Sequence, residues 1–154
     1  MSAPVRLATQ SDGASIGRLL HDFNREFNEP ITPAAEWLAQ RLARLIHDGD
    51  TEVLLADEPP VGLAVLRYQP SLWTGRLEVY LAELYVAPPR RGEGLGRALM
   101  EAALSRGRTR GGDYMLLGTS ETDTTAIALY ESLGFINRER GPHGPLMFFY
   151  EREL

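Results

Sequence analysis

The chain of 154 residues contains no cysteine and no lysine, and it has no long apolar run. The lack of cysteine excludes disulfides, thiolate metal sites and cysteine nucleophiles. Because all 16 basic residues are arginine, a Walker A phosphate loop and Schiff-base chemistry are excluded as well. No window approaches the about 18 consecutive apolar residues of a membrane span, and the first residues lack the apolar stretch of a secretory signal. We therefore expect a cytoplasmic protein with no membrane partner.

The charge of the chain indicates which partners suit it. The formal net charge is −5 and the isoelectric point about 5.2, whereas a nucleic-acid binder presents a basic face. An acidic protein suits a cationic partner such as an amine. The histidines His21, His47 and His143 lack the spacing of metal ligands. We expect no nucleic-acid partner, no metal site, and a single domain over residues 1–154.

Hydrophobic periodicity and turn residues predict the element order β-α-α-β-β-β-α-β-α-β-β. Antiparallel hairpins combined with one β-α-β-α stretch are typical of a mixed sheet in an α+β or α/β layered fold. The strand 77–86 is long, apolar and rich in β-branched and aromatic residues, so we expect it near the centre of the sheet. The helices are expected to begin near residues 12, 33, 92 and 124, and the strands at 5–9, 52–56, 61–68, 77–86, 114–118, 136–138 and 146–151.

The most informative stretch, 86–99, lies where this long strand is followed by a glycine-rich helix start. Free backbone N–H groups at a helix N-terminus bind anions, and glycines let a diphosphate approach with no Cβ in the way. Arg90, Arg91 and Arg97 can add charge-assisted hydrogen bonds. We therefore predict a phosphate-binding loop here. The alternative is a glycine-rich helix start that binds nothing.

The spacing of the glycines separates the candidate ligands. A dinucleotide fingerprint, Gly-x-Gly-x-x-Gly, that begins at Gly92 would need its third glycine at the position of Arg97. The pattern present is Arg91-x-x-Gly94-x-Gly96 after a strand that ends in Val-x-Pro. It resembles the acetyl-CoA motif of the GNAT N-acetyltransferase superfamily. The resemblance implies that acetyl-CoA binds along Arg91, Gly92, Glu93, Gly94, Leu95, Gly96 and Arg97.

The same resemblance implies a fold. We expect a GNAT-like α/β fold (an α+β mixed sheet), mostly antiparallel, with about six or seven strands flanked by about four helices. In this family the strand before the loop often splays from its neighbour, and the backbone of Leu84, Tyr85 and Val86 would pair with the pantetheine arm. A homodimer is implied by family analogy alone.

A second, independent motif follows the first: Asp123-x-x-Ala126-x-x-Leu129-Tyr130-x-x-x-Gly134-Phe135. It resembles the family's second signature, which usually has asparagine at the position of Asp123. The resemblance implies that Tyr130 contacts acetyl-CoA near its sulfur and protonates the departing thiolate. A phenol with a pKa of about 10 can do so for a more basic thiolate. Asp123, expected among the cofactor contacts, can accept hydrogen bonds or cap the helix but cannot donate as an amide does. The alternative for Tyr130 is a place at the edge of the core.

Amide formation from a thioester needs an uncharged amine, so a base must remove a proton from the ammonium form. Glu83 is the first candidate, since it interrupts an otherwise apolar strand just before the loop. A carboxylate in a semi-buried slot tends to have a raised pKa, which suits a base. The alternatives are that Glu83 faces solvent, that Glu78 or Glu121 takes this role, or that there is no dedicated base.

The function hypothesis is an enzyme that transfers the acetyl group of acetyl-CoA directly to an amine of a small molecule or of a peptide, and the acidic chain suits a cationic small molecule. An acetyl-cysteine intermediate is excluded by the absence of cysteine. The acceptor would contact three loops, 28–33, 69–74 with Trp73, and 141–145. The run Arg106-x-Arg108-x-Arg110 could reach the 3′-phosphate or complement a helix end. The alternative function is a non-catalytic module that binds acyl-CoA.

Overall fold

The computed structural model describes residues 4–27 and 29–154, which group into two compact units. The first unit runs to Leu116 and the second from Leu117 to Leu154. Each unit is described by itself, and the single domain over 1–154 stays a prediction.

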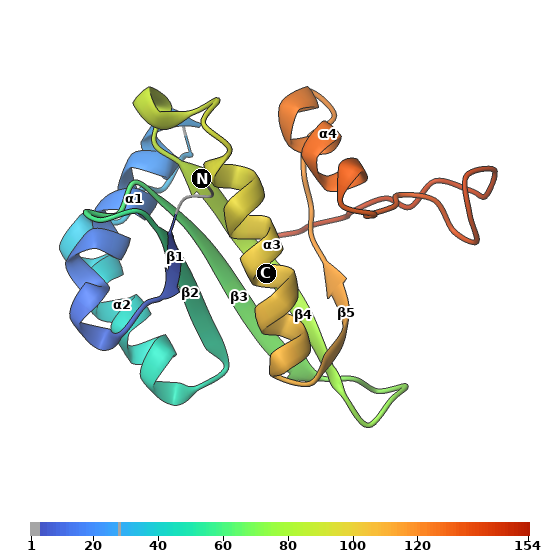
Figure 1. The fold of residues 1–154 in the computed structure, drawn as a ribbon, viewed down its shortest axis with the longest axis horizontal. Coiled ribbons are helices and arrows are strands. Elements are labelled where there is room, and N and C mark those ends of the chain that lie inside the picture. The colour runs from blue at the N-terminus through green and yellow to red at the C-terminus, as the bar shows by residue number, and fades with distance from the viewer. Residues whose placement is uncertain (1–3, 28) are drawn as a thin grey trace. The chain divides into compact units, whose positions relative to one another are not determined.

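The first unit is built on a sheet in the order β1-β2-β3-β4-β5, in which only β4 and β5 pair in parallel (Figure 1). The expected mixed, mostly antiparallel sheet is thus confirmed. The strands are β1 (Val5–Leu7), β2 (Thr51–Ala56), β3 (Gly62–Pro70), β4 (Leu77–Val86) and β5 (Gly112–Leu116), and the α-helices are α1 (Gly13–Glu26), α2 (Ala35–Asp48) and α3 (Leu95–Thr109).

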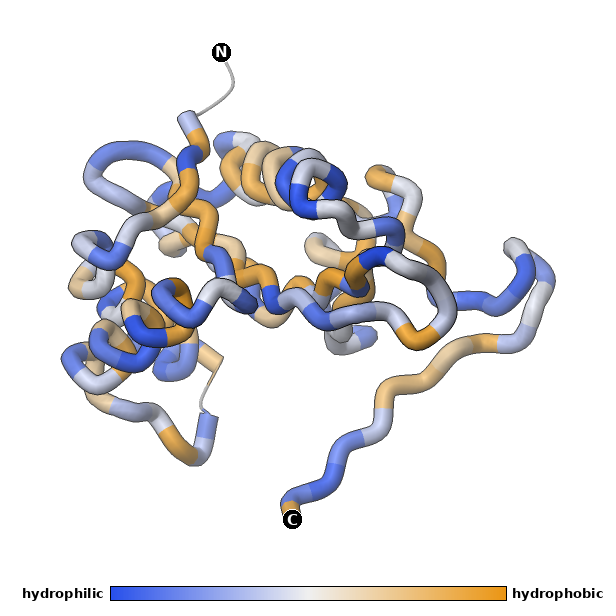
Figure 2. Tube along the Cα trace, turned by 90° about the horizontal axis from the view of Figure 1, so that it is seen from below, coloured by the Kyte–Doolittle hydropathy of each residue, from blue (hydrophilic) through white to orange (hydrophobic). Residues whose placement is uncertain are grey.

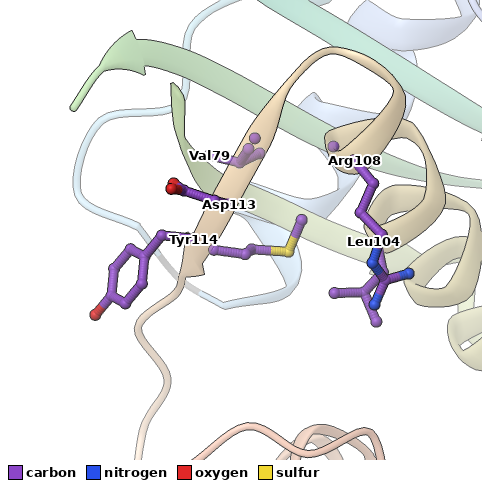
Figure 3. Close-up of a pocket in the computed structure, with 8 residues that line it drawn as sticks. Val79, Leu104, Arg108, Asp113 and Tyr114 are labelled. Atoms are coloured by element: carbon purple, nitrogen blue, oxygen red, sulfur yellow. The ribbon is translucent and has the colours of Figure 1, made fainter. Parts of the chain in front are cut away.

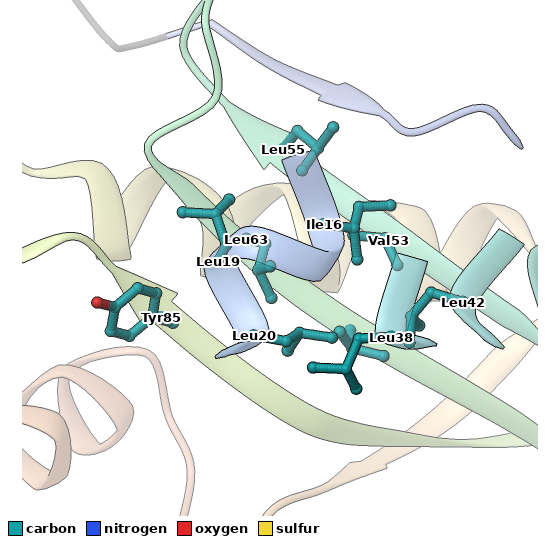
Figure 4. Packing of buried hydrophobic residues seen from close by; sticks show 10 residues of the cluster. Ile16, Leu19, Leu20, Leu38, Leu42, Val53, Leu55, Leu63 and Tyr85 are labelled. Atoms are coloured by element: carbon teal, nitrogen blue, oxygen red, sulfur yellow. The ribbon is translucent and has the colours of Figure 1, made fainter. Parts of the chain in front are cut away.

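Helices α1 and α2 cover one face of this sheet. Their buried side chains pack with residues of β2, β3 and β4 in one apolar cluster (Figure 4): Ile16, Leu19, Leu20, Leu38, Leu42, Val53, Leu55, Leu63, Val65 and Tyr85. The two helices approach closely because Gly17 has no side chain. A Cβ at Gly17 would collide with the carbonyl oxygen of Ala35.

Helix α3 covers the other face. Side chains alternate along β2, so Glu52 lies on the face opposite to Val53, where α3 packs. The Arg106 guanidinium donates to the Glu52 carboxylate at 2.7 and 3.0 Å, and the Tyr68 hydroxyl donates to it at 2.8 Å. Arg110 lies 3.2 Å from Glu52 and 4.4 Å above the Tyr68 ring. Both arginines therefore tie α3 to the sheet.

A β-bulge in β4 decides which of its side chains face α1 and α2. Val65 pairs with Glu83, but the pairing of the preceding β4 residues is shifted by one, so Ala82 is an extra residue. Before the bulge, Val79 faces α3, where it lies against Gly107. After the bulge, Glu83 shares the face of Val65, which belongs to the α1–α2 cluster. The extra residue thus turns Glu83 away from α3.

The pairing of β4 with β5 stops halfway along β4. The last pair is Tyr80 with Leu116. From Leu81 to Val86, the pairing found in the described part of the chain is with β3 alone. One backbone edge of β4 is left without a strand over this stretch, which agrees with the splaying that the resemblance implies.

The second unit contains α4 (Thr124–Ser132), which is followed by Leu133 as its C-cap and by Gly134 with a positive φ of 90°. The strands expected at 136–138 and 146–151 are wrong, since the pairing described there is one isolated bridge between Arg138 and Leu146. The sheet thus has five strands instead of six or seven. The turn 141–145 contains two prolines, which have no N–H to donate. After this turn, the Met147 N–H donates to the Asn137 carbonyl at 2.8 Å, and among the described residues this is the last backbone hydrogen bond before the C-terminus.

An exposed apolar run follows this turn. Leu146 and Met147 are 44% and 43% exposed, and Phe148 and Phe149 are 71% and 70% exposed. The run forms one orange stretch of the tube that leads to the C-terminus in Figure 2.

Candidate active site

The loop between β4 and α3 has the geometry of an anion-binding helix start. Gly92 and Gly94 have positive φ angles of 81° and 82°, so α3 begins at Leu95 and not near Gly92 as expected. The first intrahelical bond of α3 is donated by the Ala98 N–H to Gly94 at 3.0 Å. The N–H groups of residues 95–97 precede that bond, at the positive end of the helix dipole. This is the arrangement that suits a phosphate.

Arg90 braces the loop. Its guanidinium donates to Asp57, in the β2–β3 turn, at 2.8 Å and to Glu93 at 3.0 and 3.2 Å. These contacts hold Glu93, which lies between the two left-handed glycines, against the β2–β3 turn. Arg90 therefore acts as a support of the loop, although its charge had been expected to reach the phosphates.

Arg91 is bound to the end of α1. Its Nη1 and Nη2 donate to the two carboxylate oxygens of Glu26 at 2.7 and 2.8 Å, and its Nε donates to the Val86 carbonyl at 2.9 Å. The guanidinium also lies 5.6 Å from the centroid of the Tyr85 ring. The hydrogen bonds from Arg91 lower the pKa of Glu26. This partner, 65 residues away in the sequence, was not predicted.

Glu83 lies on the α1–α2 face of β4. Burial first, and then the negative charge of Glu29 in the α1–α2 connection, raise the pKa of Glu83 to about 7 from its ordinary value of 4.5. A carboxylate with this pKa is divided between its two protonation states near neutral pH, as a general base requires. The raised pKa agrees with what was expected for Glu83, and its role as the base stays a prediction, as does the alternative of Glu78 or Glu121.

Tyr85, two residues further along β4, is almost fully buried at 4% exposure. Its ring makes an edge contact with Phe23 of α1 at 5.1 Å between centroids. Burial and the nearby charge of Glu26 raise the pKa of its hydroxyl. The backbone of 84–86, predicted to bind pantetheine, is thus part of the unpaired edge of β4 and is anchored by the Tyr85 side chain.

The second unit holds the other two predicted site residues. Asp123 caps α4, since its Oδ1 accepts from the Ala126 N–H at 3.2 Å. Tyr130 is 9% exposed and its ring makes an edge contact with Phe135 at 5.9 Å. Burial, followed by the charge of Asp123, raises the pKa of Tyr130 to about 12. The phenol therefore keeps its proton at every ordinary pH. Its hydroxyl can donate a hydrogen bond, but it does not readily transfer the proton.

Of the loops expected to contact the acceptor, one has a residue on the side of Glu83 and another lies far from Glu83. Glu29 acts electrostatically on Glu83, so this residue of the expected 28–33 loop lies on the side of the predicted base, whereas Asn28 lies outside the described residues. The 69–74 turn joins β3 to the start of β4, whereas the glycine loop follows the end of β4. A ten-residue strand such as β4 separates its two ends by about 30 Å. Trp73, 89% exposed, is therefore remote from Glu83 in this chain.

A pocket of about 270 Å³ lies elsewhere in the first unit, between the C-terminal half of α3 and β5 (Figure 3). Its lining combines apolar residues with one charge of each sign, Arg108 and Asp113. It is formed near the opposite end of α3 from the glycine loop, and its lining includes Arg108, a candidate contact of the 3′-phosphate.

Within residues 4–27 and 29–154, no group of three or more His, Asp or Glu side chains is arranged to hold a metal ion. The described helices all lack the combination of length and apolar character that crossing a membrane requires.

The chain belongs to the acetyltransferase (GNAT) family, whose model matches residues 16–135. A candidate acetyltransferase from Arthrobacter sp. FB24 is 43% identical, with a TM-score of 0.89 over 99% of this chain and 97% of that one. A mycothiol acetyltransferase from Thermobispora bispora is 38% identical over 75% of this chain and 35% of its own length. A streptothricin acetyltransferase from Streptomyces lavendulae is 34% identical over 57% and 46%.

These findings confirm the family and the fold class predicted from the two motifs. Membership of this family favours an acyltransferase over the non-catalytic module. The chain spans less than half the length of the two curated relatives.

Proposed function

We propose that this protein is an N-acetyltransferase that transfers the acetyl group of acetyl-CoA directly to the amine of a cationic small molecule. The placement of Glu83 carries this proposal. The bulge at Ala82 turns a carboxylate with a pKa of about 7 onto the α1–α2 face, beside the strand edge that leads into the glycine loop. A base poised near neutral pH at this position is what deprotonation of an amine next to a bound thioester requires.

The cosubstrate would bind along β4 and the loop that follows it. Its diphosphate would accept hydrogen bonds from the N–H groups at the start of α3, within residues 91–97. Its pantetheine arm would pair with the unpaired edge of β4 at 84–86. Asp123 is proposed to contact it through acceptor atoms only, since one carboxylate oxygen already caps α4.

The reaction would proceed in one sequential pass. Glu83 takes a proton from the acceptor ammonium, and the free amine forms a C–N bond with the thioester carbonyl carbon. The C–S bond then breaks, the CoA thiolate leaves, and the nitrogen releases its second proton to solvent to give the amide. Tyr130 would donate a hydrogen bond to that thiolate, and solvent would complete its protonation, because a phenol with a pKa of about 12 does not transfer its proton readily.

The acceptor class follows from the charges around the base. Glu29 acts on Glu83 and Asp22 acts on Tyr85, while Glu26 is paired with Arg91, so the carboxylates on the α1–α2 side of β4 outnumber the cation there and leave a net negative field. A negative field attracts a cation and disfavours an anion. The amine acceptors of the mycothiol and streptothricin acetyltransferases are the first small molecules to try. A peptide amine is the second candidate, and the homodimer and the cytoplasmic location stay predictions.

Thiol release from acetyl-CoA, measured against a panel of these acceptors, polyamines, aminoglycosides and short peptides, tests the proposal. We expect turnover with a cationic small molecule and none with Gly94→Trp, because a side chain at this left-handed position would block the loop. Turnover with peptides alone would replace the acceptor class. A protein that does not bind acetyl-CoA in calorimetry would refute the proposal as a whole.

A further inference from the structure

Arg91, the first residue of the glycine motif, forms an ion pair with a carboxylate of the same chain. Glu26 receives one hydrogen bond from each terminal nitrogen of Arg91, at 2.7 and 2.8 Å. The remaining guanidinium nitrogen, Nε, donates to Val86 at 2.9 Å. A guanidinium binds a carboxylate or a phosphate through two parallel N–H groups. In this arrangement the pair of N–H groups on Nη1 and Nη2 is directed at Glu26.

The position of Glu26 in its helix does not stabilise a carboxylate, whereas the contact with Arg91 does. Glu26 is the last residue of α1, where the negative end of the helix dipole disfavours an anion. Arg91 compensates for that, and the pKa of Glu26 is lowered accordingly. The contact joins elements 65 residues apart, which distinguishes it from the i,i+4 pairs common on helix surfaces.

The contact between Arg91 and Glu26 also packs against a buried aromatic ring. Tyr85 lies beneath the Arg91 guanidinium, with its ring centroid 5.6 Å from the guanidinium carbon, and the charge of Glu26 acts on its hydroxyl. The Tyr85 ring is held in turn by Phe23 of α1. With side-chain exposures of 43% for Arg91 and 29% for Glu26, the pair remains open to solvent on one side. An entering anion can therefore reach it.

We infer that Glu26 is a competing internal anion, which Arg91 leaves when the diphosphate of acyl-CoA binds. The inference rests on the proposed function, since it takes the diphosphate to bind at the glycine loop. Glu26 then lowers the affinity for the cosubstrate, and its carboxylate is left at the end of α1 on the side assigned to the cationic acceptor. Glu26 is a positioning residue that acts through Arg91 and takes no part in the chemistry.

The test is a double-mutant cycle read by calorimetry with CoA as the probe, on the full chain. Glu26→Gln keeps the shape of the side chain and removes its charge. We expect it to bind CoA about three- to tenfold more tightly, the range of a partly exposed bidentate ion pair. Arg91→Ala should weaken CoA binding. In the Arg91→Ala background, Glu26→Gln should change the affinity less than twofold, because the competition no longer exists.

A control separates this competition from the general removal of a negative charge. Asp22→Asn removes a charge one helical turn earlier on α1, where no ion pair with Arg91 is formed. We expect it to change CoA affinity less than twofold. Equal tightening by Asp22→Asn and Glu26→Gln, no tightening by Glu26→Gln, or tightening that persists without Arg91 would each overturn the inference.

The outcome also separates the two proposals. A wild-type protein that binds no CoA refutes the proposed function itself. Normal CoA binding with weaker binding by Glu26→Gln leaves the function standing and shows that Glu26 orients Arg91 toward the diphosphate. Thermal melts of each variant establish that the measured protein is folded.

Discussion

At the scale of single residues, Glu83 has the most direct consequence. Glu83→Gln keeps the size of the side chain and removes the base, so kcat with the best acceptor should fall about a hundredfold at neutral pH. The wild-type rate should rise with pH through about 7, the pKa of Glu83, and the variant should lose that limb. Steady-state kinetics between pH 5.5 and 9 measure both effects.

Glu78→Gln is the matched control, because Glu78 lies on the same strand and accepts a hydrogen bond from Gln69 at 2.9 Å. Its rate and pH profile should stay within about twofold of the wild type. A Glu83→Gln enzyme with an intact acidic limb would show that another group is the base.

Tyr130 is expected to act on the leaving group. Tyr130→Phe removes one hydroxyl and with it a hydrogen bond to a charged thiolate, so kcat should fall about tenfold or more. The dissociation constant of CoA should change little, because the ring still packs on Phe135. Single-turnover kinetics combined with calorimetry separate the two quantities, and a loss confined to CoA binding would assign Tyr130 to the core instead.

At the scale of secondary-structure elements, the contact between α1 and α2 depends on Gly17. Replacing a helical glycine with alanine usually stabilises a helix by about 1 kcal/mol. At Gly17 the added methyl group would collide with the Ala35 carbonyl, so Gly17→Ala should lower the free energy of unfolding by about 2 kcal/mol. Urea titration followed by circular dichroism measures the change.

Gly107 of α3 provides the opposite case. The nearest atom to a Cβ there would be a methyl carbon of Val79 at 3.5 Å, an ordinary contact. Gly107→Ala should therefore be neutral or stabilising by up to about 1 kcal/mol. If both substitutions stabilised the protein, the close approach of α1 to α2 would be wrong.

The sequence predicted the elements more completely than it predicted their partners. Glu83, the glycine loop and the helix cap at Asp123 are local features, which periodicity and turn residues disclose. The partner of Arg91 depends on a fold that brings residue 26 to residue 91, and no local pattern encodes that. The same applies to Arg106, which was expected to reach a phosphate or solvent and instead binds Glu52. The run 146–151 resembles a strand, but pairing needs a neighbour that local propensity does not supply.

At the scale of the whole molecule, two carboxylates should shape the pH dependence of stability in opposite directions. Burial would raise the pKa of Glu52, but the hydrogen bonds from Arg106 and Tyr68 outweigh it and lower the pKa. Its contribution to stability is therefore present above about pH 4.5, the value in the unfolded chain, and is lost as pH falls. The pKa of Glu83 is raised, so its contribution is present below about pH 4.5 and is lost as pH rises through about 7.

Thermal melts at several pH values test both signs. The melting temperature of Glu83→Gln, relative to the wild type, should rise between pH 5 and pH 8. That of Glu52→Gln should lie below the wild type at pH 7, and the gap should narrow as the pH drops below 4. A gap that is constant with pH for either variant would contradict the environment described for that carboxylate.

The single extra residue in β4 also bears on how this protein is compared with its relatives. Because Ala82 shifts the pairing of the strand, positions on either side of it follow different inside-outside patterns. A relative whose strand is regular would carry the equivalent carboxylate one position away. An alignment without a gap at Ala82 would then match Glu83 to a side chain that points to the opposite face. Alignments and mutational scans of this family should therefore match β4 by its bulge and not by residue count alone.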